Sequence, residues 1–113
     1  IRSTGDSRYA YEVAKAVARQ CRSIGLSWVH SPVLDINTDP RNPEIGIRSY
    51  SDDPEVVAEY ALQACRGFKE IGLIATGKHF PGRGQSDVDA HFQVPVIEIN
   101  IPIQRIHIHI FEF

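Results

Sequence analysis

Apolar residues recur at helical spacing in two stretches of the chain. Between residues 9 and 24, and again between residues 54 and 71, every third or fourth position is apolar, while charged residues fall mostly on the other faces. The apolar positions are Ala10, Val13, Ala14, Val17, Cys21 and Ile24 in the first stretch and Val57, Tyr60, Ala61, Ala64, Phe68 and Ile71 in the second. This pattern predicts two amphipathic helices with one buried face each.

The ends of both helices carry their own signals. Residues 1–7 are mostly Ser, Thr, Gly and Asp, which predicts a loop that ends in a helix N-cap. Asp53 followed by Pro54 gives the second helix a carboxylate cap and then a proline where a missing N–H costs nothing. Gly25 and Gly72 suit the left-handed residue that follows a helix.

Each of these glycines leads into a short apolar run, at residues 26–30 and 73–76. Their β-branched and aromatic members predict two strands. The order helix, strand, loop, helix, strand, loop favours an α/β fold with a parallel sheet and helices packed outside it. The two units have the same pattern, which fits an architecture of repeated units.

The segments between and after these elements are irregular. Residues 38–51 form a long segment in which Pro40, Pro43 and Gly46 exclude regular structure. Ile45, Ile47 and Tyr50 interrupt its polar residues and predict an ordered, packed loop. Residues 94–97 predict a buried extended segment.

Residues 101–113 alternate isoleucine with other residues, which predicts a strand that Pro102 confines to an edge or a start. His107 and His109 share one face of it. They could chelate a metal, although the pattern favours histidines on the solvent side of an edge strand.

Composition limits the class of protein. The 113 residues are 42% apolar and 23% charged, which is typical of one globular domain. A net charge of −2 gives no reason to expect nucleic acid or an anionic membrane as partner. No apolar run reaches the roughly 20 residues that span a bilayer. Cys21 and Cys65 lie on the apolar helix faces, so we expect small buried side chains rather than a disulfide.

The first residue is Ile1, and the chain has no methionine. We therefore expect either a processed N-terminus or a fragment of a longer protein. No signal peptide is visible, but a missing start would hide one, so the compartment stays open between cytoplasm and secretion. The oligomeric state also stays open.

Chemically versatile groups gather in residues 78–91, directly after the second predicted strand. They include Lys78, His79, Asp87, Asp89 and His91, spaced by glycines and a proline. Loops at the ends of buried strands are where α/β enzymes usually keep their reactive groups. Lys78 and His79 either form a clamp for hydroxyls or an anion, or are a solvated lysine beside a core histidine.

Asp89 and His91 are close enough in a bent loop for the carboxylate to accept a proton from the ring. That contact would fix the tautomer and make His91 a usable acid or base near neutral pH. The alternative is a surface salt bridge. A metal site of His79, Asp87, Asp89 and His91 is a rival, but these residues lack the compact spacing of known zinc sites. We therefore expect no metal and no cofactor.

Arg48 is a forked donor in the loop between the two units, able to bind vicinal hydroxyls or a carboxylate. The alternative is a structural ion pair with Asp52 or Asp53. Asp35 ends a strand-like run, and we expect it to cap or brace its own loop.

Four motifs together resemble the family-3 glycoside hydrolases. They are Ser31-Pro32-Val33-Leu34-Asp35, Asn42-Pro43-x-Ile45-Gly46-x-Arg48-Ser49-Tyr50-Ser51-x-Asp53-Pro54, Lys78-His79-Phe80-Pro81-Gly82-x-Gly84 and Asp89-x-His91. The last two are similar to the β-N-acetylglucosaminidase branch. The resemblance covers residues 10–97 with the motifs in the right order.

The resemblance implies that residues 1–113 are a fragment of an N-terminal catalytic domain, a partial TIM-type (β/α)8 barrel with parallel strands and outer helices. It implies that Arg48, Lys78 and His79 hydrogen-bond the non-reducing-end sugar, and that Asp89 and His91 are an acid/base pair. The family's reaction is a retaining hydrolysis through a glycosyl-enzyme on an aspartate. The implied substrate is a short glycan with terminal β-linked N-acetylglucosamine, such as a peptidoglycan fragment.

Three departures qualify this expectation. The family's nucleophilic aspartate lies downstream of these residues, and its upstream strands and sugar-binding carboxylate have no counterpart here; a whole barrel needs about 250 residues. We therefore expect the 113 residues alone to have no hydrolase activity. The tail also departs, because the branch has a helical stretch where residues 101–113 alternate.

Three alternatives remain. A phosphorylase is one, because a histidine acid/base repels an incoming phosphate less than a carboxylate would. The second is a non-catalytic carbohydrate-binding partial barrel. The third is a chain that does not fold alone, because an open parallel sheet leaves edges and inner faces uncovered.

Overall fold

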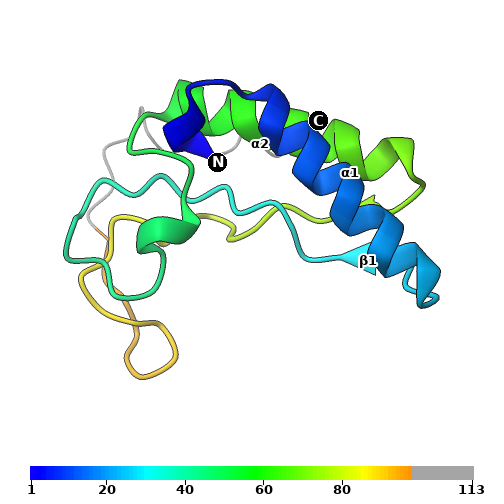
Figure 1. The fold of residues 1–113 in the computed structure, drawn as a ribbon. Coiled ribbons are helices and arrows are strands. Elements are labelled where there is room, and N and C mark those ends of the chain that lie inside the picture. The colour runs from blue at the N-terminus through cyan, green and yellow to red at the C-terminus, as the bar shows by residue number, and fades with distance from the viewer. Residues whose placement is uncertain (98–113) are drawn as a thin grey trace.

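Two helices pack over two short parallel strands in the computed structural model, which describes residues 1–97 (Figure 1). The elements are the 3-10 helix η1 (Arg2–Thr4), α1 (Arg8–Ser23), β1 (Trp28–Val29), the 3-10 helix η2 (Gly46–Arg48), α2 (Pro54–Glu70) and β2 (Ile74–Ala75). Both long helices and both strands lie where the sequence predicts them, although the strands are shorter. The strand expected in residues 101–113, with His107 and His109, lies outside the described residues.

The strands pair in parallel, as predicted, with Trp28 opposite Ile74 and Val29 opposite Ala75. The Trp28 Nε1–H also donates to Thr76 Oγ1 at 2.6 Å, just beyond the end of β2. Parallel strands connected through a helix are the unit from which α/β domains are built. The α/β class is therefore confirmed for the described residues, whereas a closed barrel stays a prediction.

A line of alanines on α1 contacts α2. Ala10, Ala14 and Ala18 are each at most 3% exposed and share a core with buried residues of α2. Opposite them is Gly67, where an added Cβ would collide with the carbonyl oxygen of Tyr11. The small residues therefore let the two helix backbones approach closely.

This close approach moves the buried face of α1 away from part of the predicted stripe. Val13 and Val17 were expected to be buried, but they are 45% and 37% exposed, and Ile24 is 75% exposed. The contact follows the alanines because a valine on that line would hold α2 further away. The stripe predicted for α2 is confirmed from Val57 to Phe68.

An aspartate accepts a hydrogen bond from the first backbone N–H groups of each long helix. Asp53 Oδ1 accepts a hydrogen bond from the Glu55 N–H at 2.9 Å, with Pro54 at the first helical position, as predicted. At α1 the N-cap residue is Ser7, whose side chain makes no capping hydrogen bond, and Asp6 Oδ1 accepts from the Arg8 N–H at 2.9 Å instead. Gly72 follows the C-cap of α2 with φ of 72°, the left-handed conformation expected there.

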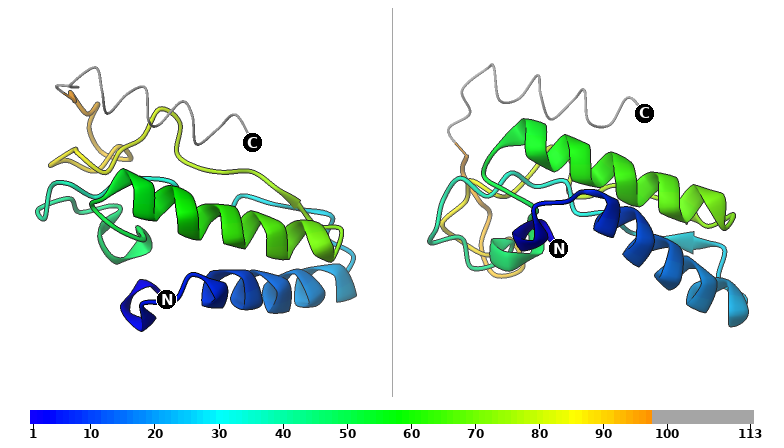
Figure 2. Two further views of the ribbon diagram at one scale, coloured as in Figure 1. Left: turned by 90° about the horizontal axis from the view of Figure 1, so that it is seen from above. Right: turned by 45° about the horizontal axis from the view of Figure 1, so that its top comes forward.

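The loops that follow the two strands lie together at one end of the molecule, the end at which both helices begin (Figures 1 and 2). The first loop is ordered around Ile45, which is 1% exposed, but Ile47 is fully exposed and does not pack as expected. Residues 94–97 form no strand, and Val94 and Val96 are exposed, so the predicted buried segment is wrong: no partner strand lies beside it in residues 1–97.

In the part of the chain that the structure describes, no helix has the length and apolar character that crossing a membrane requires.

Candidate active site

Asp35 ties the two strand-end loops together. Its side chain is fully buried. Oδ2 accepts from the His79 N–H at 3.1 Å and lies 2.6 Å from His79 Nδ1, while Oδ1 accepts from the Arg83 N–H at 2.6 Å. The sequence predicts that Asp35 braces its own loop, and this prediction is wrong. The carboxylate instead braces the loop after β2.

Lys78 and His79 extend the parallel pairing beyond β2. Lys78 bridges Val33, and its N–H donates to the Pro32 carbonyl at 3.0 Å. The Lys78–His79 peptide bond is cis. Both side chains are only partly buried, and Nδ1 of His79 is engaged by Asp35. His79 is therefore fixed in orientation, with Nε2 as the ring nitrogen left for a ligand.

The two loops meet again at Gly84. An added Cβ there would collide with the carbonyl group of Ile36. Beside this contact, Asn42 Nδ2 donates to the carbonyl oxygens of Arg83 at 2.7 Å and Ser86 at 2.8 Å. The segment after Gly82 is therefore held against the first loop by backbone packing and by a buried amide.

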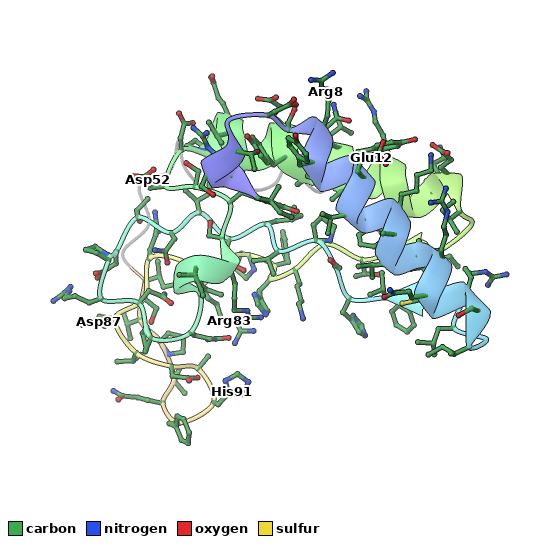
Figure 3. The ribbon with its side chains drawn as sticks, viewed as in Figure 1. Arg8, Glu12, Asp52, Arg83, Asp87 and His91 are labelled. Carbon is green, nitrogen blue, oxygen red and sulfur yellow. The ribbon has the colours of Figure 1, made fainter. Side chains whose placement is uncertain are left out.

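Asp89 and His91 contact one another as the sequence predicts. Asp89 Oδ1 lies 2.7 Å from His91 Nδ1 and accepts from the His91 N–H at 2.8 Å. These hydrogen bonds from His91, backbone first, with a weaker contribution from the Arg83 charge, lower the pKa of Asp89 below its usual value. The His91 side chain is 68% exposed at the loop end of the molecule, where Figure 3 shows it with Arg83 and Asp87. The pair is thus a carboxylate and an open imidazole.

Arg48 lies in η2 and lines a cleft of about 530 Å³ together with Ser31, Val33 and Tyr50. Its Nη1 donates to the Glu44 carbonyl at 3.0 Å. The alternative of an ion pair with Asp52 or Asp53 is therefore not found.

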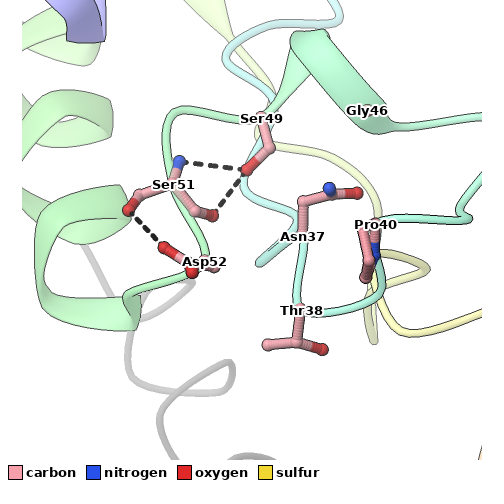
Figure 4. Close-up of a pocket in the computed structure, with 7 residues that line it drawn as sticks. All are labelled: Asn37, Thr38, Pro40, Gly46, Ser49, Ser51 and Asp52. Carbon is pink, nitrogen blue, oxygen red and sulfur yellow. Dashed lines mark hydrogen bonds between the residues drawn. The ribbon is translucent and has the colours of Figure 1, made fainter.

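A second cleft, of about 360 Å³, lies between the start of the first loop and the residues before α2 (Figure 4). Its hydroxyls bond to their own neighbours: Ser49 Oγ donates to the Ser51 carbonyl at 2.8 Å, and Ser51 Oγ donates to Asp52 Oδ1 at 3.2 Å. No residue that the sequence singled out for sugar binding or acid/base chemistry lines this cleft.

Glu44 is the residue that the sequence reasoning missed. Its Oε1 forms an ion pair with Arg83 Nη1 at 2.8 Å, and a carboxylate oxygen of Glu44 lies within 4.8 Å of ligand atoms of Asp89 and His91. The local sequence signal was weak: Glu44 lies two residues after Asn42, whose Oδ1 accepts from the Glu44 N–H at 3.0 Å. The contacts themselves span about forty residues of sequence and leave no local pattern.

The metal set considered from the sequence is not brought together as one group, because His79 is bound to Asp35. Among residues 1–97, the cluster that could hold an ion is Glu44, Asp89 and His91. The guanidinium of Arg83, already paired with Glu44, opposes a cation there.

The predicted site residues therefore form two groups. Asp35 holds His79, and Asp89 holds His91. Within residues 1–97 no hydrogen bond or ion pair joins Arg48, Lys78 or His79 to the Asp89–His91 pair.

The sequence of the chain matches a known protein family. The model of the glycosyl hydrolase family 3 N terminal domain matches residues 1–112. The chain belongs to glycoside hydrolase family 3. The family resemblance that the motifs carry is confirmed.

Similar proteins include beta-hexosaminidases, a family 3 beta-N-acetylglucosaminidase and a beta-glucoside phosphorylase. Beta-hexosaminidase A of Pseudoalteromonas piscicida is 37% identical over 80% of this chain and 15% of its own length. The family 3 beta-N-acetylglucosaminidase of Paenibacillus sp. str. FPU-7 is 38% identical over 97% of this chain and 21% of its own, with a TM-score of 0.91. A beta-glucoside phosphorylase, BglX, is 34% identical over 80% and 16%, with a TM-score of 0.78. The chain thus spans between 15% and 21% of the length of these relatives.

Proposed function

We propose that the full-length protein removes terminal β-linked N-acetylglucosamine from short glycans by a retaining mechanism. The observation that carries this proposal is the contact of 2.7 Å between Asp89 Oδ1 and His91 Nδ1, on a loop at the carboxyl ends of parallel strands. The beta-hexosaminidase and beta-N-acetylglucosaminidase relatives support the substrate class.

His91 is the acid/base group in this proposal. The Asp89 carboxylate accepts a hydrogen bond from the Nδ1–H and stabilises the imidazolium, so that Nε2 faces the leaving oxygen. His91 protonates that oxygen as the glycosidic bond breaks, and the neutral ring then takes a proton from the water that hydrolyses the glycosyl-enzyme. The exposed position of the ring leaves room for the sugar and the water.

Arg48, Lys78 and His79 bind the non-reducing-end sugar in this proposal. Asp35 supports it by fixing His79 Nδ1, which turns Nε2 toward a sugar hydroxyl. Arg48 supports it by presenting a forked donor to a cleft at the strand ends.

We also propose that residues 1–113 are part of an N-terminal catalytic (β/α)8 barrel domain. The two repeated units supply a quarter of the eight strands that such a barrel needs. The nucleophilic carboxylate comes from residues beyond these, so the 113-residue chain alone is expected to show no turnover.

The test compares leaving groups in the full-length protein. In His91→Ala, kcat/KM for an aryl N-acetyl-β-glucosaminide with a basic leaving group should fall by about 10²–10⁴-fold, because proton donation is lost. A 2,4-dinitrophenyl leaving group departs without a proton. The kcat/KM for that substrate should therefore fall much less. Equal losses for both substrates, or no loss, would refute the acid role of His91.

A phosphorylase is the second candidate, favoured by the relationship to the beta-glucoside phosphorylase. A neutral or cationic imidazole at the acid/base position admits a phosphate anion better than a carboxylate does. Assays with and without inorganic phosphate separate the two functions. A hydrolase gives the free sugar at the same rate in both, whereas a phosphorylase gives the sugar 1-phosphate and slows without phosphate.

A further inference from the structure

We propose that Glu44 is a positioning residue that holds residues 83–91, here called the flap, where His91 can transfer protons. This inference rests on the proposed function. Glu44 lies in the loop after β1, whereas the flap follows β2, so its contacts join two separate repeat units.

One carboxylate contacts both ends of the flap. Glu44 Oε1 forms an ion pair with Arg83 Nη1 at 2.8 Å that lacks hydrogen-bond geometry, and Oε2 accepts from the Ala90 N–H at 3.4 Å. Ala90 lies between the two members of the acid/base pair. The Glu44 side chain is 5% exposed, so this ion pair is screened less than a surface pair. Glu44 therefore fixes the first residue of the flap and the peptide from which His91 follows.

Glu44 is itself held in place by Asn42. Asn42 Oδ1 accepts from the N–H groups of Glu44 at 3.0 Å and Ile45 at 2.6 Å, while its Nδ2 donates to two flap carbonyls. The buried amide thus sets the distance between the Glu44 backbone and the flap. The carboxylate reaches Arg83 and Ala90 from a backbone that is already fixed, so little entropy is lost in forming these contacts.

Two carboxylates, those of Asp89 and Glu44, lie close to the His91 ring. Ligand atoms of Glu44, Asp89 and His91 lie within 4.8 Å of one another, and Arg83 faces the same cluster with the opposite charge. Without Glu44, the Arg83 guanidinium would lose its partner and the Ala90 N–H its acceptor. The ring would then shift, and misplacement of a catalytic group by about 1 Å can cost about 10²-fold in rate.

Kinetics in the full-length protein test this, with a chelator present so that no ion occupies the cluster. Glu44→Ala should lower kcat by about 10- to 100-fold with KM changed by less than about threefold, because the sugar contacts are untouched. Glu44→Gln keeps an acceptor for Ala90 and should recover part of kcat. The control Glu59→Ala, on an exposed position of α2, should have no effect. A rise in KM with unchanged kcat, or an unchanged kcat and KM, would overturn the proposal.

A double-mutant cycle separates positioning of His91 from general damage. In the His91→Ala background, Glu44→Ala should cost less than about twofold in kcat, because the group it positions is gone. Fully additive losses would mean that Glu44 acts elsewhere and would overturn the proposal.

Amide hydrogen exchange gives a readout that does not depend on activity. Glu44→Ala should accelerate exchange at the Ala90 and His91 amides by at least about tenfold, while the α2 amides stay unchanged. Unchanged exchange in the flap would refute the positioning role. If His91→Ala leaves kcat unaltered, the proposed function fails, and faster flap exchange in Glu44→Ala would still establish that Glu44 holds the flap.

Discussion

Asp35 and His79 are joined by a contact of 2.6 Å between Oδ2 and Nδ1, across 44 residues of sequence and between the loops of the two repeat units. The same carboxylate also accepts the backbone N–H of His79 and, through Oδ1, that of Arg83. A single buried side chain therefore sets the start of the loop after β2 relative to the first repeat unit.

Replacement of Asp35 by alanine should destabilise the protein strongly. It leaves two backbone N–H groups and an imidazole without acceptors, and each unpaired buried group costs about 1–3 kcal/mol. We expect the free energy of unfolding to fall by about 3 kcal/mol or more in a urea titration. The exposed Asp52→Asn should change it by less than about 0.5 kcal/mol. Equal values for the two variants would contradict the bracing role.

Gly84→Ala should damage the site by steric exclusion. The new Cβ would meet the backbone of Ile36, which cannot rotate away, so the two loops must separate. Such overpacking typically costs about 1–3 kcal/mol, and we expect the full-length protein to lose kcat/KM beyond what its loss of stability explains. Gly5→Ala is the control: no atom lies within 4 Å of its Cβ, so only its left-handed φ of 74° is penalised and activity per folded molecule should persist.

Gly67→Ala should destabilise the protein although alanine favours helices. Helix propensity alone predicts a gain of about 1 kcal/mol. The Cβ would, however, collide with the Tyr11 carbonyl and press on Ala14, so we expect a net loss of about 1–3 kcal/mol. The sign of the change in Tm decides the question. A higher Tm would show that α1 and α2 do not pack this closely.

Asp89 should titrate below its usual pKa of 3.8, because His91 donates to its carboxylate. A carboxyl group with a lowered pKa stabilises the fold when ionised. The contribution of Asp89 to the free energy of unfolding is therefore complete when the pH lies above 3.8. It is lost as the pH falls through the lowered pKa of Asp89. Carbonyl-carbon NMR should show this, and His91→Ala should bring the pKa of Asp89 back toward its usual value. An Asp89 that titrates at or above 3.8 would contradict the contact.

Local patterns predicted the elements well because local forces determine them. Spacing gave α1 and α2, Asp53 with Pro54 gave a helix start, and Asp89 and His91 are close enough in sequence to form a turn of their own. The family motifs likewise lie within single loops.

The errors come from contacts between segments far apart in sequence. Val13 is exposed because the alanines of α1 pack against Gly67 of α2. The sequence of one helix does not show which residues of the other helix it contacts. Asp35 and Glu44 act through groups about forty residues away. Such residues carry the same local signature as surface carboxylates, and only the folded backbone distinguishes them.

The hydrogen bond from the Trp28 indole to Thr76 gives this chain a built-in optical probe. Trp28 is the single tryptophan, it lies in β1, and its donor group ends on the residue that follows β2. The tryptophan fluorescence of the chain therefore comes from the junction of its two repeat units, and its emission wavelength follows their pairing without any added label.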